Sequence, residues 1–235
     1  MKRFLTLSRN DFRMVFRDPM LRLFLLLPLL IILAVVWGIP PVFAAYPAVQ
    51  DYDYVILMWA GTQASTLFGF INGFVFLEEK DEHVFAALRV MPIAASTLIG
   101  VRMLLGVSIA FAVNVTTFSL CPWLPMSSVE VLLIALQYSL LAPLLTLALA
   151  TFAENKVEGL AQFKVYNFII ILPALIYFLP FRALHALAVV PTYWTFRSVE
   201  AVHSGEHYFL FIGIGFVAYI VAFVALVRFF EQRVF

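Results

Sequence analysis

Six long apolar stretches, separated by short polar or turn-forming segments, account for most of this chain of 235 residues. A helix needs about 20 mostly apolar residues to cross the hydrocarbon core of a bilayer. The segments between the stretches are rich in Gly, Pro and charged residues, which are typical of turns. The pattern predicts an all-α, polytopic membrane protein whose single transmembrane domain covers residues 1–235. The six predicted spans are residues 20–36, 54–77, 94–120, 129–152, 165–181 and 208–230.

Composition supports this fold class. Hydrophobic residues make up 64% of the chain and charged residues 12%, whereas a soluble domain is roughly 45–50% apolar and about 25% charged. A soluble globular fold is therefore excluded. The net charge of +1 gives no indication of a nucleic-acid partner. The single cysteine, Cys121, excludes an internal disulfide and a cysteine-based zinc site.

The distribution of Lys and Arg predicts the orientation, because cytoplasmic loops carry an excess of both. With a cytoplasmic N-terminus, Arg182 and Arg197 fall on the outer side, Arg102 lies within the third span, and all the others are cytoplasmic. Both termini are therefore predicted to be cytoplasmic. The cytoplasmic set is Lys2, Arg3, Arg9, Arg13, Arg17, Arg22, Lys80, Arg89, Lys156, Lys164, Arg228 and Arg233.

An interfacial helix is predicted over residues 4–18, ahead of the first span. Arg9, Arg13 and Arg17 follow one another at four-residue spacing, and Phe12 and Phe16 lie beside them on an apolar face. Such a helix lies at the membrane surface with its cations toward lipid headgroups or a partner. A plain positive-inside anchor and a docking role for a partner remain equally good interpretations.

A short amphipathic helix is predicted over residues 79–91, between the second and third spans. Acidic residues crowd its start and Arg89 stands near its end, which matches the helix dipole. Val84, Leu88 and Met91 recur at helical spacing and form an apolar face. The acidic start disfavours contact with the anionic inner leaflet. Docking into a groove of a soluble partner therefore fits better than a place on the bilayer.

The outer segment, residues 182–207, is too long for a tight turn and is amphipathic in places. Backbone at membrane depth must be helical or shielded by protein. One or two short helices that partly re-enter the outer leaflet are predicted. Within this segment, His203 and His207 have a spacing that suits a metal in a helix, but the intervening Ser-Gly favours an exposed turn.

The second span carries a stripe of small residues at four-residue spacing, which allows a neighbouring helix to approach closely. The stripe is Gly61, Ser65, Gly69 and Gly73. Polar residues in spans two and five either bond to a neighbouring helix or face a substrate pathway, and both interpretations stay open. The candidate pathway residues are Gln63, Thr66, Asn72, Tyr166 and Asn167.

Arg102 and two prolines complete the unusual residues of the spans. Arg102 lies about two turns into the third span. It either snorkels toward the cytoplasm and pairs with an acidic residue of segment 79–91, which we favour, or lies in a pathway. Pro143 and Pro173 predict kinks in the fourth and fifth spans.

Motifs of independent chemistry are missing from the sequence. It has no G-x-x-x-x-G-K-[ST] loop, no H-E-x-x-H and no G-x-S-x-G. The chain therefore has no site of its own for ATP, no metal site is predicted, and no residue is predicted to be catalytic. The predicted spans also carry no Asp or Glu at mid-depth, where ion-coupled carriers commonly place carboxylates.

This set of features resembles the membrane subunit of a type-2 ATP-binding-cassette exporter over essentially the whole chain. The most specific match is residues 79–92, which look like that family's E-K-[DE]-E-x-x-x-x-x-L-x-x-x-P segment after the second span. Within the family, the chain is most similar to small permeases that export drugs of the fluoroquinolone type.

The resemblance implies a bacterial inner-membrane protein that forms a homodimer or pairs with a homologous permease, on two separate ATP-binding-cassette subunits that hold ATP and Mg²⁺. Spans two and five would line the route, and residues 4–18 would lie beside the coupling helix. The coupling residues it implies are Glu79, Lys80, Asp81, Glu82, His83, Val84, Phe85, Leu88, Arg89 and Met91.

The leading hypothesis is thus a non-catalytic permease subunit that exports a hydrophobic or amphipathic substrate such as a drug, lipid, glycolipid or peptide. The spans offer aromatic rings and hydroxyls but no ring of fixed charge. An ion-coupled secondary transporter is the alternative, and it predicts internal repeats and mid-membrane carboxylates. An intramembrane enzyme is the third, and it requires convergent His, Asp, Glu or Ser groups at depth.

Overall fold

The computed structural model describes residues 16–81 and 95–234, and every regular element in these two ranges is helical. The elements are α2 (Pro19–Leu33), η1 (Ala34–Gly38), α3 (Ile39–Ala45), α4 (Pro47–Gln50), α5 (Asp53–Asp81), α7 (Ala95–Ser119), α8 (Ser128–Ser139), α9 (Leu141–Phe152), α10 (Lys156–Ile171), η2 (Leu172–Tyr177), η3 (Arg182–Val189), α11 (Pro191–His203) and α12 (Phe209–Val234).

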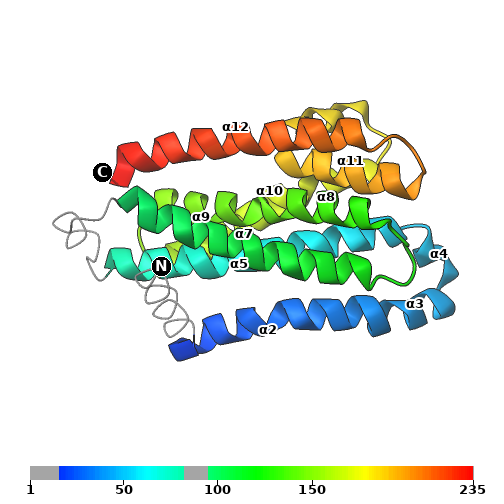
Figure 1. Ribbon diagram of the computed structural model, residues 1–235, viewed down its shortest axis with the longest axis horizontal. Helices are drawn as coiled ribbons and strands as arrows, with labels where there is room; N and C mark the ends of the chain where they lie inside the picture. Colours follow the sequence, from blue (N-terminus) through cyan, green and yellow to red (C-terminus); the bar gives the residue numbers. More distant parts are fainter. Residues whose placement is uncertain (1–15, 82–94, 235) are drawn as a thin grey trace.

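The long helices lie side by side in one bundle (Figure 1). The end where α2 begins and α12 ends is called the proximal end. The opposite end, called the distal end, holds α3, α4 and the last turn of α11. Successive long helices run in alternating directions between these two ends, as short connections require.

Helix α5 is the central helix of the bundle and packs against α2, α7, α9 and α10. Phe70, at its middle, is fully buried, and its ring centroid lies 4.4 Å from that of Phe24 in α2 and 4.3 Å from that of Phe163 in α10. In lipid, helices associate through such close packing and through hydrogen bonds rather than through the hydrophobic effect. The packed aromatic rings therefore fix the positions of α2 and α10 against α5.

Six segments of the described chain are long and apolar enough to cross a membrane. They are Pro19–Ala45, Asp53–Asp81, Arg102–Ser119, Ser128–Phe152, Lys156–Tyr177 and Phe209–Phe230. Helices α2 and α12 expose apolar side chains such as Leu26, Leu30, Val217 and Val221, as contact with lipid requires. The predicted fold class, an all-α multi-pass membrane protein with six spans, is confirmed.

The sequence predicts that the first span ends before Gly38, which is wrong. The helix continues to Ala45, because the π-helical turn η1 joins α2 directly to α3. Pro40 lies in the first turn of α3. At that position the missing N–H of proline costs no essential hydrogen bond, so the proline does not end the helix.

The predicted start of the fifth span at residue 165 is also wrong, because α10 begins at Lys156. Asn155 caps the helix by accepting a hydrogen bond from the Glu158 amide at 3.0 Å, and the Glu158 carboxylate accepts one from the Glu154 amide at 2.8 Å. This reciprocal capping starts the helix within a charged segment that suggests a loop. The α-helix ends at Ile171, and Pro173 lies in the 3₁₀ helix η2 that follows.

The predicted fourth span is divided into α8 and α9 at Leu140. Pro143 has no N–H to donate to a carbonyl one turn earlier, so the helical hydrogen bonding is interrupted at this point. The break agrees with the kink predicted at Pro143.

Two predicted surface helices lie mostly outside the described residues. Of segment 4–18, the structure describes Phe16 and Arg17, which are exposed, and Asp18, which caps α2 by accepting from the Met20 amide at 2.8 Å. The predicted residues that lie outside the described ranges are Arg9, Phe12, Arg13, Glu82, His83, Val84, Phe85, Leu88, Arg89 and Met91.

Candidate functional site

The stripe of small residues on α5 is where this helix meets its neighbours most closely. Gly69 and Gly73 lie against α9, at Ala142 and Leu149 respectively. Because Gly69 has no side chain, the Thr146 hydroxyl of α9 donates to the Gly69 carbonyl at 3.1 Å. The stripe continues toward the distal end, where Gly61 lies against the rings of Phe118 and Tyr138, and the Ser65 hydroxyl accepts from the Asn114 amide at 2.8 Å.

The opposite side of α5 meets α10 through a pair of amides. Gln63 Nε2 donates to Asn167 Oδ1 at 3.2 Å, and both side chains are partly exposed. Spans two and five, which the resemblance implies as the walls of the route, therefore touch through two of the five candidate pathway residues.

The other three candidates do not share this surface. Thr66 is fully buried and donates to the backbone of its own helix. Asn72 packs against Gly106 of α7. Tyr166 donates to Gln162 of its own helix at 3.1 Å and packs against the core. The interpretation of these residues as helix-packing groups fits their contacts, and a single pathway lined by all five does not.

An apolar groove of about 320 Å³ lies between the distal half of α5, the end of α10, η2 and Phe196 of α11. We call it the α5–α10 groove. Trp59 stands one turn before Gln63 on α5, and Phe168 follows Asn167 on α10, so each amide is close in the chain to an aromatic wall of the groove without lining it. Its main walls are Met58, Trp59, Phe168, Leu172, Phe178 and Phe196.

The groove is lined by apolar side chains, and three of its aromatic rings are exposed. Trp59, Phe168 and Phe178 are each about half exposed or more, with 48%, 64% and 52% of their surface accessible. Small-molecule sites of this kind are mostly apolar with a few placed polar groups. The sequence does not single out these rings, because aromatic residues make up 16% of the chain and recur in every span.

The segment η3–α11 enters the bundle from the distal end and returns to it. Thr192, at the start of α11, donates to the Ile170 carbonyl near the end of α10 at 2.6 Å. His203, at the other end of α11, lies 3.6 Å from Asp53 at the start of α5 and stacks on Tyr54. This path is the two-helix arrangement expected for residues 182–207. Gly205 has φ 69°, so a turn follows α11, as the Ser-Gly pair predicts.

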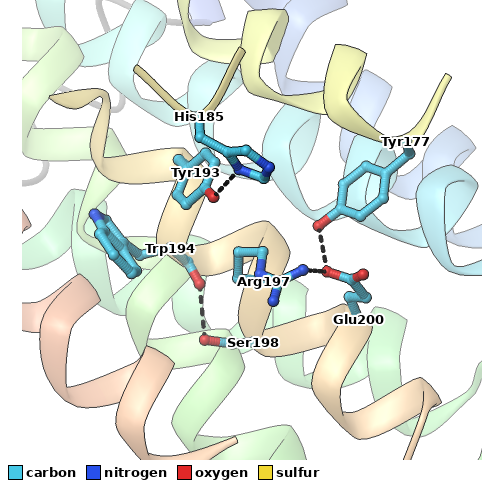
Figure 2. Close-up of polar contacts among 7 residues, drawn as sticks. All are labelled: Tyr177, His185, Tyr193, Trp194, Arg197, Ser198 and Glu200. Atoms are coloured by element: carbon cyan, nitrogen blue, oxygen red, sulfur yellow. Dashed lines mark hydrogen bonds and ion pairs between the residues drawn. The ribbon is translucent and has the colours of Figure 1, made fainter. Parts of the chain in front are cut away.

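Polar contacts hold this segment together at the distal end (Figure 2). Tyr177 of η2 donates to the Glu200 carboxylate at 3.1 Å, and Arg197 pairs with the same carboxylate at 2.5 Å. The ring of His185 in η3 lies 2.8 Å from the Tyr193 hydroxyl. Glu200 thus links η2 to α11. Phe196, on the same helix α11, is one of the walls of the α5–α10 groove. Sequence reasoning missed Tyr177 and Glu200, which are 23 positions apart and carry no motif.

At the proximal end, Glu79 and Arg102 form a buried ion pair. Two guanidinium nitrogens of Arg102 donate to the two carboxylate oxygens of Glu79, with Nη2 to Oε1 at 2.6 Å. Both residues are more than nine-tenths buried. The predicted pairing of Arg102 with an acidic residue of segment 79–91 is therefore confirmed.

The same contact corrects the predicted place of two residues that the resemblance implies for coupling. Glu79 and Lys80 belong to α5 rather than to a separate surface helix, and Glu79 faces the inside of the bundle. Lys80 donates to the Ala153 carbonyl at the end of α9 at 2.9 Å. The sequence pattern misleads here, because a cluster of charges after an apolar span normally marks the solvent. Asp81 is exposed.

Two further observations bear on chemistry. Among the residues that the structure describes, no group of three or more His, Cys, Asp and Glu residues is placed to hold a metal ion. Cys121 is buried in the connection between α7 and α8, and burial raises the pKa of its thiol.

A bundle of six helices long and apolar enough to cross a bilayer defines the class of multi-pass membrane proteins. The chain belongs to the Rv2686c-like family of fluoroquinolones export permease proteins, whose family model matches residues 11–227. This match confirms the resemblance to small drug-export permeases of the type-2 class.

Two relatives support the assignment. They are the fluoroquinolones export permease proteins MT2760 and Rv2686c of Mycobacterium tuberculosis, from strains CDC 1551 and H37Rv. Each is 28% identical to the chain over 208 residues, which cover 81% of this chain and 79% of the relative. No solved structure matches the chain.

Proposed function

We propose that this chain is the permease subunit of an ATP-driven exporter that moves flat aromatic drugs of the fluoroquinolone type out of the cytoplasm. The observation that carries the proposal is the α5–α10 groove with its aromatic walls, two of which, Trp59 and Phe168, are close in the chain to the hydrogen-bonded amides Gln63 and Asn167. A planar ring system stacks on such walls, while its polar edge bonds to the amides. The relatives named as fluoroquinolones export permeases support this substrate class.

The proximal end of the bundle faces the cytoplasm in this proposal. Lys80, Lys156 and Arg228 stand at or near that end, and the excess of Lys and Arg there satisfies the positive-inside rule. Both termini are then cytoplasmic, and the membrane is the bacterial inner membrane. Segment η3–α11 lies on the outer side and closes the groove from the periplasm.

Two separate ATP-binding-cassette subunits bind the proximal end and hold the ATP and Mg²⁺ that this chain has no motif to bind. Because Glu79 and Lys80 are engaged within the bundle, contact with the ATPase falls to Asp81 and the residues that follow it, up to residue 91. A second copy of the chain, or a homologous permease, completes the exporter.

Transport into inside-out membrane vesicles tests this function. Vesicles from cells of the natural host, with the permease overproduced or deleted, are given the fluorescent fluoroquinolone ciprofloxacin. The proposal predicts uptake that requires the permease and ATP, is blocked by vanadate and persists in the presence of a protonophore.

An ion-coupled carrier gives the opposite result. Uptake that a pH gradient drives without ATP, and that the protonophore abolishes, would contradict the proposed function and support the alternative class.

A further inference from the structure

Three consecutive residues at the proximal end of α5 each contact a different helix of the bundle. Glu78 forms an ion pair with Lys156 of α10 at 3.2 Å. Glu79 accepts two hydrogen bonds from Arg102 of α7. Lys80 donates to the carbonyl of Ala153, the residue that caps the C-terminal end of α9. We call Glu78, Glu79 and Lys80 the α5 hub.

Helix geometry explains why neighbours in sequence reach different partners. Successive residues of an α-helix point about 100° apart around its axis. The three side chains of the α5 hub therefore spread over more than half of the circumference of α5. Lys156 extends the set to a fourth helix, because its ammonium group also lies 3.8 Å from Asp18, the residue that caps α2.

Burying the charges of Glu79 and Arg102 carries a large desolvation cost. We therefore interpret the pair as a contact that positions α5 relative to α7. Removing two charges from water costs much of what their attraction returns, so a buried ion pair adds little net stability over an apolar pair. The two-pronged geometry does fix the relative orientation of the two helices. Arg102 also lies over the ring of Phe76, one turn earlier on α5, at 5.3 Å from the ring centroid.

The α5 hub stands at the point where the proposed coupling segment enters the bundle. Residues 82–94 follow the end of α5 at Asp81 and lead to Ala95, the first residue of α7. The Glu79–Arg102 pair joins the two helices that this segment connects. A displacement of residues 82–94 therefore moves α5 and α7 where the Glu79–Arg102 pair connects them. At the same level, Glu78 and Lys80 connect α5 to α10 and α9.

We propose that the α5 hub makes the proximal ends of α2, α5, α7, α9 and α10 move as one body when the ATPase displaces residues 82–94. Glu78, Glu79, Lys80 and Arg102 are then positioning residues for transport, and their side chains do not contact substrate. This inference rests on the proposed function, because it requires a motor at the proximal end. It goes beyond that function in stating how the motion spreads through the permease.

The decisive variant removes both charges of the buried pair, Glu79→Gln together with Arg102→Gln. Neither charge of the Glu79–Arg102 pair is then buried without the other, so the double variant inserts and retains its ATPase. The single variant Glu79→Gln removes the carboxylate that accepts the two hydrogen bonds from Arg102, and it lowers the amount of folded permease. Lys80→Met is a second test at a partly exposed position, where folding is less sensitive. Arg228→Gln and Glu206→Gln remove exposed charges elsewhere and serve as controls.

The readout is ciprofloxacin uptake per ATP hydrolysed in the inside-out vesicles, at matched amounts of permease and of co-purifying ATPase. Residues that couple two sites typically change their coupling by about 2- to 30-fold, and a drop of that size is expected in the double variant and in Lys80→Met. The controls keep the wild-type ratio. A purely structural role would change the amount of folded protein and leave this ratio unchanged.

The outcomes separate the two proposals. A wild-type ratio in the double variant, or in Lys80→Met if the double variant does not fold, overturns the role of the α5 hub while the proposed function stands. Wild-type vesicles without ATP-driven uptake overturn the proposed function itself, and the role of the hub with it.

Discussion

Gly69 of α5 lies so close to Ala142 of α9 that a Cβ atom at position 69 would be 2.7 Å from the Ala142 carbonyl oxygen. Real Cβ atoms do not approach a backbone oxygen this closely, so only glycine permits the observed distance between the two helices. The contact holds the centre of the bundle together, and the orientation of α5 beside the groove depends on it.

Gly69→Ala is therefore expected to destabilise the permease by about 1–3 kcal/mol through overpacking against α9. Gly213→Ala is the matched control, because position 213 lies in a long helix with open space around it. There alanine raises helix propensity by up to about 1 kcal/mol. Thermal unfolding in detergent, followed by size-exclusion chromatography, measures both. Equal stability of the two variants would contradict the close contact.

Trp59 is expected to bind the drug through ring stacking in the α5–α10 groove. Loss of an aromatic contact worth about 0.5–1.5 kcal/mol raises the KM of Trp59→Ala by about 2- to 12-fold. The rate at saturating drug changes little, because the residue takes no part in coupling. Trp37→Ala, which removes an exposed tryptophan outside the groove, serves as the control. An unchanged KM in Trp59→Ala, or an equal rise in Trp37→Ala, would contradict the proposed site.

Thr192 is expected to fix the start of α11 inside the bundle. Thr192→Val keeps the shape of the side chain and removes the hydrogen bond to Ile170, at a cost of about 0.5–1.5 kcal/mol. Thr116→Val is the control, because that hydroxyl is exposed and bonds to its own helix. Denaturation in mild detergent measures both. A control as destabilised as Thr192→Val would argue against this contact as the anchor of α11.

Cysteine labelling tests the proposed orientation. Maleimides react with the thiolate, and burial raises the pKa of Cys121. The wild-type protein is therefore labelled slowly at neutral pH and faster as the pH rises. This low background permits variants with one added cysteine to be labelled without removal of Cys121.

Glu206→Cys at the exposed distal turn and Glu154→Cys at the exposed proximal turn are the two probes. A membrane-impermeant maleimide is expected to label Glu206→Cys in intact spheroplasts and Glu154→Cys only after permeabilisation. The reverse pattern would place the proximal end outside the cell and contradict the proposed orientation.

The sequence predicts the fold class because apolar length and the distribution of charge are local properties. The number of spans follows from them, and the stripe on α5 follows from the four-residue spacing of its small residues. The start of α10 and the path through η1 do not follow, because each depends on a local hydrogen-bond pattern: Asn155 caps one helix within a charged segment, and a π-turn carries the other past Pro40.

The candidate site is harder to predict, because it depends on which helices become neighbours. Gln63 and Asn167 are 104 positions apart, and the rings of the groove are not distinguishable from lipid-facing aromatics in the sequence. The same limit explains Glu79. The sequence predicts that Arg102 pairs with an acidic residue of segment 79–91, and only the position of α7 shows that this residue is Glu79 and that it is buried.

Site-specific photo-crosslinking tests the central claim, that a separate ATPase binds the proximal end of this permease. A photoreactive phenylalanine derivative is placed at Asp81, the exposed last residue of α5, and at Glu206 at the distal end. Cells of the natural host that show ATP-driven ciprofloxacin export are irradiated, and the adducts are identified by mass spectrometry. The account predicts an adduct with an ATP-binding-cassette subunit from Asp81 and none from Glu206. An ATPase adduct from Glu206, or none from Asp81 while export is intact, would contradict it.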